Sequence, residues 1–300
     1  MSGRRPLASH PPARLQAPGR EAQLRAALSA ARAAGTVIRR GFRCLEAGDV
    51  RAKGVNDFVT RVDLEAEAAI RKVIAARFPG HNVLAEEMGG QDSGDGPLWV
   101  IDPLDGTTNF IHGIPQFAVS LALLEGGRSV FGLIHEPLSG DIFRAAAGGG
   151  AFLNDRPIAV SRTDELAGAL GATGFPFKAP AQRPAYARAF AALLERCQDM
   201  RRCGAAALDL AYVACGRFDF FWEAHLLPWD FLAGKLIVEE AGGRTGDFAG
   251  EALSLKTGSV LAANPRLYPV LQAEIGRYFN GPSDKFIESS IEIGERSGRT

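Results

Sequence analysis

The sequence has few cysteines, no excess of either charge and no long apolar segment. Its 4 cysteines include no C-x-x-C pair and its 5 histidines no H-E-x-x-H motif, so no zinc site is indicated. The 34 basic and 34 acidic residues cancel, which argues against nucleic acid or an anionic membrane as the main partner. Without an apolar leader or an apolar run of about 18 residues, the sequence predicts a reduced, cytoplasmic protein that does not enter membranes.

The middle of the chain has the composition of a folded protein, whereas its ends do not. Hydrophobic residues make up 46% and charged residues 23% of the 300 residues, which excludes a disordered or fibrous chain. Residues 1–21 contain several arginines and prolines and no acid before Glu21, so they predict a flexible basic tail. Residues 281–300 predict a polar C-terminal tail. The folded part should therefore span 22–280.

Helical and strand-like patterns alternate through this folded part. Apolar spacing predicts helices over 22–42, 63–73, 184–196, 205–215, 230–241 and 267–278. Short β-rich runs bounded by Gly or Pro predict strands over 55–60, 82–85, 98–101, 117–124, 130–135, 142–146, 170–173, 218–222 and 259–262. This mixture predicts a layered α/β or α+β sandwich with two lobes that divide near residue 165.

Two aspartates follow one of these strands. The apolar run 98–101 continues directly into Asp102-Pro103-Leu104-Asp105-Gly106. Proline keeps the residue before it extended, and Asp-Gly favours a turn. Both carboxylates are therefore expected near the carboxyl end of one strand. The backbone N–H groups that follow the turn could face an anion.

Two further acids stand at comparable positions. Glu86 follows the strand 82–85, and Asp230 precedes an apolar helix. Taken singly, each acid is explained by a turn, a helix N-cap or an exposed corner. Taken together, they are typical of strand ends that meet at one edge of a layered α/β fold. Carboxylates about 4 Å apart repel by about 4 kcal/mol per pair at an effective dielectric of about 20, so such a cluster requires cations. All-oxygen ligands favour Mg²⁺ or Mn²⁺, and nearby N–H groups favour phosphate as the shared ligand.

These segments carry a resemblance to a known family. Asp102-Pro-Leu-Asp-Gly-Thr-Thr-Asn-Phe110 and Pro228-Trp-Asp-Phe-Leu-Ala-Gly234 resemble the two signature motifs of the inositol monophosphatase family. Lys53-Gly-Val-Asn-Asp-Phe-Val-Thr-Arg-Val-Asp63 and Ala85-Glu-Glu87 resemble its other site segments, in the same order. The resemblance covers 22–278, and Arg202-Cys-Gly-Ala-Ala-Ala-Leu-Asp-Leu210 is most similar to the bacterial type.

The resemblance implies an αβαβα sandwich of the sugar-phosphatase type with mixed sheets, a homodimer, and a lithium-sensitive, Mg²⁺-dependent phosphomonoesterase. By position, the implied metal ligands are Glu86, Asp102, the Leu104 carbonyl, Asp105 and Asp230. Glu86 and Thr107 would orient the attacking water, Asp63 would support Thr107, and Lys53 would lie on a mobile loop near the metals. The amides of Gly106 and Thr107 would hold phosphate oxygens. Asp230, Gly204, Ala205, Ala206 and Glu223 would face the rest of the substrate.

Other reactions and substrates are weighed against this one. The sequence has no G-x-S-x-G, and Gly234-Lys235 lacks the remaining P-loop residues, so nucleophilic-serine and NTPase chemistry are excluded. Inositol 1-phosphate is the leading substrate, with histidinol phosphate and fructose 1,6-bisphosphate as alternatives. The short Glu86-to-Asp102 spacing argues against nucleotide 3′-phosphates. A hypothesis from another class is a factor that binds transcription or ribosome-assembly machinery through the basic tail.

Polar residues outside the motifs have structural interpretations. Asp209 lies inside a predicted helix and is expected to pair with Arg201 or Arg202. His112 and His135 stand in or beside apolar strands, which is typical of core or rim histidines rather than ligands.

Overall fold

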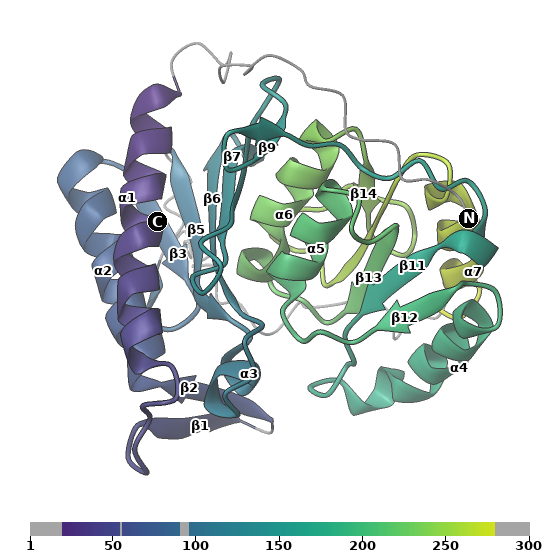
Figure 1. Ribbon diagram of the computed structural model, residues 1–300, viewed down its shortest axis with the longest axis horizontal. Helices are drawn as coiled ribbons and strands as arrows, with labels where there is room; N and C mark the ends of the chain where they lie inside the picture. Colours follow the sequence, from purple (N-terminus) through teal and green to yellow (C-terminus); the bar gives the residue numbers. More distant parts are fainter. Residues whose placement is uncertain (1–19, 55, 91–95, 280–300) are drawn as a thin grey trace, which may run out of the picture.

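Five layers of helix and sheet alternate through the protein (Figure 1). The structure is a computed structural model that describes residues 20–54, 56–90 and 96–279. Helices α1 (Glu21–Gly41) and α2 (Arg61–Arg77) form one outer layer, and α4 (Arg183–Leu194) and α7 (Tyr268–Gly276) form the other. Helices α5 (Ala206–Ala214) and α6 (Pro228–Glu240) lie between the two sheets. The predicted αβαβα sandwich is confirmed.

The first sheet has eight strands in the order β10-β9-β8-β7-β6-β5-β3-β4. Their bounds are β3 Asn82–Ala85, β4 Gly89–Gly90, β5 Leu98–Asp105, β6 Ala118–Glu125, β7 Arg128–His135, β8 Ile142–Ala146, β9 Ala151–Leu153 and β10 Arg156–Pro157. Strands β3 and β5 are parallel, and the other neighbours are antiparallel. Because β3 and β5 are parallel neighbours, the residues that follow their carboxyl ends lie at one edge of the sheet.

The second sheet has five strands in the order β12-β11-β13-β15-β14. Their bounds are β11 Leu170–Thr173, β12 Asp199–Arg201, β13 Phe220–Ala224, β14 Arg244–Gly246 and β15 Ser259–Ala263. Strand β11 is parallel to both of its neighbours, whereas β15 is antiparallel to β13 and β14. The first sheet ends at residue 157 and the second begins at 170, on either side of the expected division near 165.

Three hydrophobic cores fill the spaces between the five layers. The first joins α1 and α2 to one face of the first sheet, where alanines on α1 allow close helix packing. The second surrounds α5 and α6 between the sheets, and the third lies under α4 and α7. Helix α6 contributes to the middle core from Phe231 to Val238, so the positions of both sheets depend on it.

Some element boundaries differ from the predicted ones. Helix α2 begins at Arg61 rather than at Asp63, because the Thr60 side chain accepts the N–H groups of Val62 and Asp63 while Asp63 accepts the Thr60 N–H. The region predicted as strand 55–60 is part of a hairpin, with β1 (Val50–Gly54) and β2 (Asp57–Thr60) antiparallel.

The first residues of two later elements also differ from the predicted ones. Strand β13 begins at Phe220, since the Asp219 carboxylate is used to accept the Leu170 N–H at the start of β11. Helix α6 begins at Pro228, where the missing N–H of proline costs no helical hydrogen bond. The short helix α3 (Thr107–Ile111) has too few residues to produce a helical pattern in the sequence.

The ends of the chain are described only in part. Helix α1 begins at Glu21, and Arg20 forms an ion pair of 2.5 Å with Glu125 of β6, so these two residues belong to the folded part. The remainder of the predicted basic tail and the predicted polar C-terminal tail lie outside the described residues. Across 20–54, 56–90 and 96–279, no helix combines the length and the apolarity required to cross a membrane.

Candidate active site

Three aspartates from two layers are fixed by backbone hydrogen bonds. Asp102 and Asp105 lie in β5, which runs to Asp105, and Asp230 lies in the first turn of α6. Each uses one carboxylate oxygen to accept a backbone N–H, from Leu104 (2.9 Å), Ala207 (2.8 Å) and Leu227 (2.7 Å), respectively. The bond between Asp105 and Ala207 connects the first sheet to α5.

These aspartates line a cavity of about 390 Å³. Of the other predicted site residues, the cavity is also lined by Glu86, Leu104, Gly106, Thr107, Gly204 and Glu223. Residues of both sheets therefore meet there, including segments more than 100 positions apart in the sequence. The predicted residues Lys53, Asp63, Ala205 and Ala206 do not form part of the cavity lining.

The cavity is strongly acidic, and its three aspartates disfavour ionisation. Burial raises the pKa of Asp102 well above its usual range, and the charges of Glu86, Asp105 and Asp230 raise it further. Burial and the charge of Asp230 do the same for Asp105. For Asp230, burial and then Glu86 raise the pKa to about 7. This mutual repulsion is what an added cation would relieve.

Lys53 already places one positive charge on this cluster. Its Nζ lies 2.9 Å from Glu86 Oε1 and 2.8 Å from Glu87 Oε1. Burial lowers the pKa of Lys53, but the charges of Glu86 and Glu87 outweigh that effect and the pKa is raised. Lys53 lies on β1 of the hairpin and not in a loop as predicted.

Glu67 orders the turn that carries these two glutamates and was not predicted. It is fully buried on α2, forms an ion pair of 2.7 Å with Arg71, and accepts the N–H groups of Glu87 and Met88. Burial and the charge of Glu86 raise the pKa of Glu87 to about 7. A helix position with a single acid gives no sequence signal for this role, because most such acids face solvent.

Thr107 and Asp63 form a hydrogen-bonded pair beside the aspartates. Thr107 Oγ1 lies 2.9 Å from Asp63 Oδ1 and 3.1 Å from the Leu104 carbonyl. Asp63 is 1% exposed, and its other oxygen accepts the Thr60 N–H. Burial is the main cause that raises the pKa of Asp63 to about 6. Asp63 does not line the cavity itself and is connected to it by the hydrogen bond with Thr107.

Gly106 permits the turn between β5 and α3. Its φ of 97° is in the left-handed region, and a Cβ there would lie 2.9 Å from the Gln116 carbonyl. Helix α3 begins at the next residue, so the N–H groups at its start have no partner within the helix. Gly106, Thr107 and Thr108 all line the cavity.

The opposite wall contains cationic and aromatic side chains that were not predicted. Arg202 and Lys178 line it beside Glu223, and Arg202 lies 5.5 Å from the centre of the Phe177 ring. Burial raises the pKa of Glu223 well above its usual range, although Arg202 partly opposes this. Gly204 is held near α3 by Asn109, whose Nδ2 donates to the Cys203 carbonyl at 2.9 Å. Ala205 and Ala206 lie behind this wall, 1% and 6% exposed.

The predicted ion pair of Asp209 is wrong. Arg201 instead pairs with Asp199 at 2.5 Å, and Asp209 forms no ion pair within the described part of the chain. It is 1% exposed, and one of its oxygens has no hydrogen-bond partner. Burial raises the pKa of Asp209 to about 8, while a hydrogen bond with Cys203 lowers it only in part. Asp209 is therefore a buried acid behind the cavity.

The donor set fits a hard divalent cation. Glu86, the Leu104 carbonyl and the three aspartates supply only oxygen, which is the ligand type of Mg²⁺. In residues 20–54, 56–90 and 96–279, no three acidic, histidine or cysteine side chains already stand together as a metal-binding group. Rotation of these side chains would be needed to bring their free oxygens onto one ion.

Comparison with known proteins identifies the class. The sequence model of the Inositol monophosphatase family matches residues 20–280. The chain therefore belongs to this family and is a phosphatase of the inositol monophosphatase type, as its motifs predicted.

Its curated relatives include bacterial proteins named Nus factor SuhB. The protein from Escherichia coli strain K12 is 45% identical over 253 residues, which cover 84% of this chain and 95% of the relative. The protein from Pseudomonas aeruginosa is 44% identical over 257 residues, with 84% and 95% covered.

Solved structures agree with this assignment. The extragenic suppressor protein suhB from Bartonella henselae has a TM-score of 0.82 and 37% identity, covering 85% of this chain and 98% of that one. An inositol monophosphatase (IMPase) from Thermotoga maritima has a TM-score of 0.79 and 32% identity, with 86% and 98% covered.

Proposed function

We propose that this protein is a Mg²⁺-dependent phosphomonoesterase that hydrolyses inositol 1-phosphate or a similar polyol or sugar phosphate. The observation that carries the proposal is the meeting of Asp102, Asp105 and Asp230 with Glu86 in one cavity, beside the Thr107–Asp63 pair. The raised pKa values of the three aspartates indicate an acidic site built to receive positive charge.

The metal ligands would be Glu86, Asp102, the Leu104 carbonyl, Asp105 and Asp230. When bound, Mg²⁺ would lower the pKa of a coordinated water and neutralise charge on the phosphoryl and leaving oxygens. The hydrogen bonds from Leu104, Ala207 and Leu227 each occupy one carboxylate oxygen, which leaves the other oxygen of each aspartate for the ion.

The attacking water would be oriented by Glu86 and Thr107. Because Thr107 Oγ1 donates to Asp63, its lone pairs are free to accept a hydrogen bond from that water. The raised pKa of Asp63, about 6, allows it to take up a proton that passes through Thr107. The water oxygen forms the new bond to phosphorus, and the bond from phosphorus to the leaving oxygen breaks in line.

The phosphate and the alcohol would occupy opposite parts of the cavity. The amides of Gly106 and Thr107 at the start of α3 would donate to phosphate oxygens. Gly204, Glu223 and Asp230 would face the alcohol, with Ala205 and Ala206 shaping the wall from behind. Burial raises the pKa of Glu223 well above its usual range, although Arg202 partly opposes this, so the wall that would face the alcohol disfavours a second negative charge beside Asp230.

The test is phosphate release from inositol 1-phosphate, fructose 1,6-bisphosphate, histidinol phosphate and 3′-phosphoadenosine 5′-phosphate. We expect the highest kcat/KM with inositol 1-phosphate, a strict requirement for Mg²⁺ and inhibition by Li⁺. A preference for histidinol phosphate or fructose 1,6-bisphosphate would keep the reaction and change the substrate. Full activity in EDTA would contradict the proposal. Size-exclusion chromatography with light scattering tests the homodimer that we propose alongside.

A matched pair of variants separates the site from general damage. Asp105→Asn keeps the shape and an acceptor for the Ala207 N–H but removes the charge. Asp164→Asn makes the same change at an acid whose side chain is 69% exposed and lies in an ion pair with Arg266. Only Asp105→Asn should abolish phosphate release.

We also propose a second function, binding to transcription machinery, because relatives that match 84% of this chain are named Nus factors. Asp105→Asn should leave such binding unchanged while abolishing phosphate release. Deletion of residues 1–19, which spares the Arg20–Glu125 ion pair, tests whether the basic tail takes part. Co-purification with transcription complexes measures both. Because the family match begins at residue 20, binding that survives the deletion would assign the contact to the folded part.

A further inference from the structure

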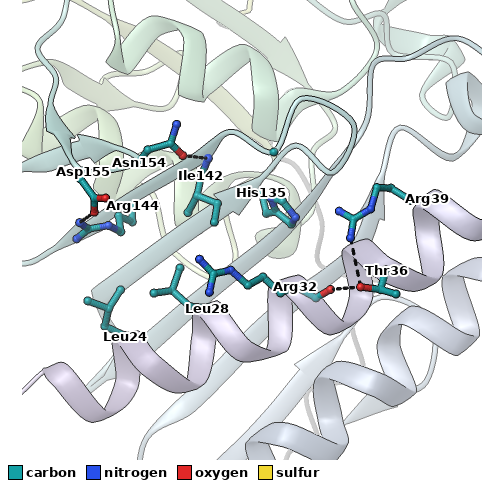
Figure 2. Close-up of a pocket in the computed structure, with 11 residues that line it drawn as sticks. Leu24, Leu28, Arg32, Thr36, Arg39, His135, Ile142, Arg144, Asn154 and Asp155 are labelled. Atoms are coloured by element: carbon teal, nitrogen blue, oxygen red, sulfur yellow. Dashed lines mark hydrogen bonds and ion pairs between the residues drawn. The ribbon is translucent and has the colours of Figure 1, made fainter.

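A second cavity, of about 680 Å³, lies between α1, strands β7 and β8 of the first sheet, and the turn that follows β9 (Figure 2). It shares no lining residue with the acidic cavity. Its walls carry Arg32, Arg39 and Arg144, and its acidic residue is Asp155. Leu24, Leu28 and Ile142 provide an apolar surface. The two cavities therefore have opposite charge.

Arg144 is the buried cation of this second cavity. It lies on β8, is 9% exposed, and its guanidinium packs 4.9 Å from the centre of the Phe152 ring. Its Nη2 approaches Asp155 at 3.5 Å, but the Asp155 side chain is fully exposed to solvent. The Nη1 atom is buried and has no hydrogen-bond partner. A buried guanidinium nitrogen without an acceptor is unfavourable, and because Arg144 lines the cavity, an oxyanion bound to its guanidinium would offset part of that cost.

Arg32 is available from the opposite wall. In Figure 2 its side chain extends from α1 into the space between the helix and Ile142, toward Leu28. Its guanidinium forms no hydrogen bond or ion pair with any residue of the described part of the chain, and Arg32 is exposed. Arg39, by contrast, already donates to the Pro137 carbonyl at 3.1 Å. Arg32, whose guanidinium has no partner in the described part of the chain, and Arg144, whose Nη1 has none, are therefore the cavity cations least engaged by the protein itself.

His135 forms one end of the cavity. The ring is 3% exposed and packs against Gly35 of α1, where a Cβ would lie 2.7 Å from its Nε2. Burial lowers the pKa of His135, and the charges of Arg39 and Arg32 lower it further, while Glu136 and the Asp141 carbonyl oppose the change. The ring is therefore uncharged near neutral pH, and the arginines carry the positive charge.

We propose that this second cavity binds a small organic oxyanion, a phosphate or a carboxylate with an apolar part. Its oxygens would lie between Arg32 and Arg144, because the guanidinium fork matches both anions. Its apolar part would lie on Leu24, Leu28 and Ile142. The site is independent of the phosphatase reaction.

The histidines give each cavity its own reporter. His135 lines the second cavity and His225 lines the acidic one. Phenylphosphonate and benzoate, which the enzyme cannot hydrolyse as phosphate esters, are titrated in EDTA while the histidine ring signals are followed by NMR. We expect saturable shifts at His135 with a Kd of about 1 mM or tighter for at least one probe, and no shift at His225. The probe that binds more tightly identifies the anionic group.

Variants on one helix decide whether Arg32 binds the anion. Arg32→Glu should weaken binding at least tenfold, whereas Arg25→Glu, the same change at an exposed α1 position outside the cavity, should leave it within twofold. Arg144→Met keeps the contact with Phe152 and should also weaken binding; its thermal stability is recorded in parallel. Shifts only at His225, no shift at His135 up to about 10 mM of either probe, or equal losses in the two glutamate variants would overturn the proposal.

Discussion

The two cavities of this protein differ in charge and in how their residues are brought together. The acidic cavity gathers carboxylates that follow β3, end β5 and begin α6, and burial and repulsion raise the pKa values of the three aspartates Asp102, Asp105 and Asp230. The second cavity gathers arginines from α1 and β8, with Asp155 exposed at its rim. The acidic cavity attracts cations and the second cavity attracts anions. Because the two cavities share no lining residue, a substitution in one leaves the lining of the other unchanged.

The largest expected effect is that of Asp105→Asn in the acidic cavity. Loss of a metal ligand should reduce kcat/KM for inositol 1-phosphate about a thousandfold, which corresponds to about 4 kcal/mol of transition-state stabilisation. Phosphate release measures it. The His135 titration with phenylphosphonate should be unchanged in this variant. Activity within tenfold of wild type would show that Asp105 does not hold the cation.

Thr107 should matter through its hydroxyl. Thr107→Ala removes the group that connects the cavity to Asp63, and kcat should fall about a hundredfold with little change in KM. Thr107→Ser retains the hydroxyl and should stay within about tenfold of wild type. Steady-state kinetics of both variants, compared side by side, measure the effect. Equal losses in the two would mean that the threonine acts only by packing.

In the second cavity, Gly35→Ala tests how closely α1 must approach His135. The new methyl group would lie 2.7 Å from the ring, so the free energy of unfolding should fall by about 1–3 kcal/mol. Gly48→Ala, which meets no atom within 4 Å, is the control and should change it by less than about 0.5 kcal/mol. Urea unfolding followed by fluorescence measures both. An unchanged stability for Gly35→Ala would show that the helix can move away.

The last expected effect is the pH dependence of the metal-free protein, which concerns stability and not activity. The folded pKa values of about 6 for Asp63 and about 7 for Asp230 exceed the ordinary 3.8, so the folded state holds more protons than the unfolded state in this window. Stability is therefore lost as pH rises from about 4 to about 7, and each kcal/mol that is lost lowers Tm by about 2–4 °C. Thermal unfolding in EDTA measures it. Mg²⁺ should raise Tm more at pH 8 than at pH 6, and a Tm that rises with pH would contradict this account.

The acidic site was predictable because its residues follow strands within short motifs. Asp102, Asp105 and Asp230 are placed by the strand or helix that carries them, and the layered fold brings those elements to one edge. Glu67 and Arg202 were missed, since their roles depend on contacts across elements that no local pattern records. The position of Lys53 near the acids was expected from its motif, but its strand was not, because β1 has five mostly exposed residues, too few for its alternation to stand out.

The fold was predictable at the level of layers and less so at its boundaries. The buried strands β5 to β8 produced clear apolar runs. Short elements such as β4, β10 and β14 contain two or three residues, which is below the length at which periodicity is detectable. The second cavity left no trace in the sequence, because Arg32 and Arg144 are isolated arginines more than 100 positions apart that only the packing of α1 on the sheet brings together.

Because Asp230 lies at its start, helix α6 also determines which substitutions far from the acidic cavity can inactivate the enzyme. Its close packing uses two glycines, since a Cβ on Gly234 would lie 2.6 Å from Leu210 and one on Gly132 would lie 2.7 Å from the Ala233 carbonyl. A side chain at either position would displace the helix and, with it, Asp230 at its first turn. A random-mutagenesis screen for inactive but folded enzyme should therefore recover substitutions at these buried glycines, remote from the substrate, as often as changes to the acids themselves.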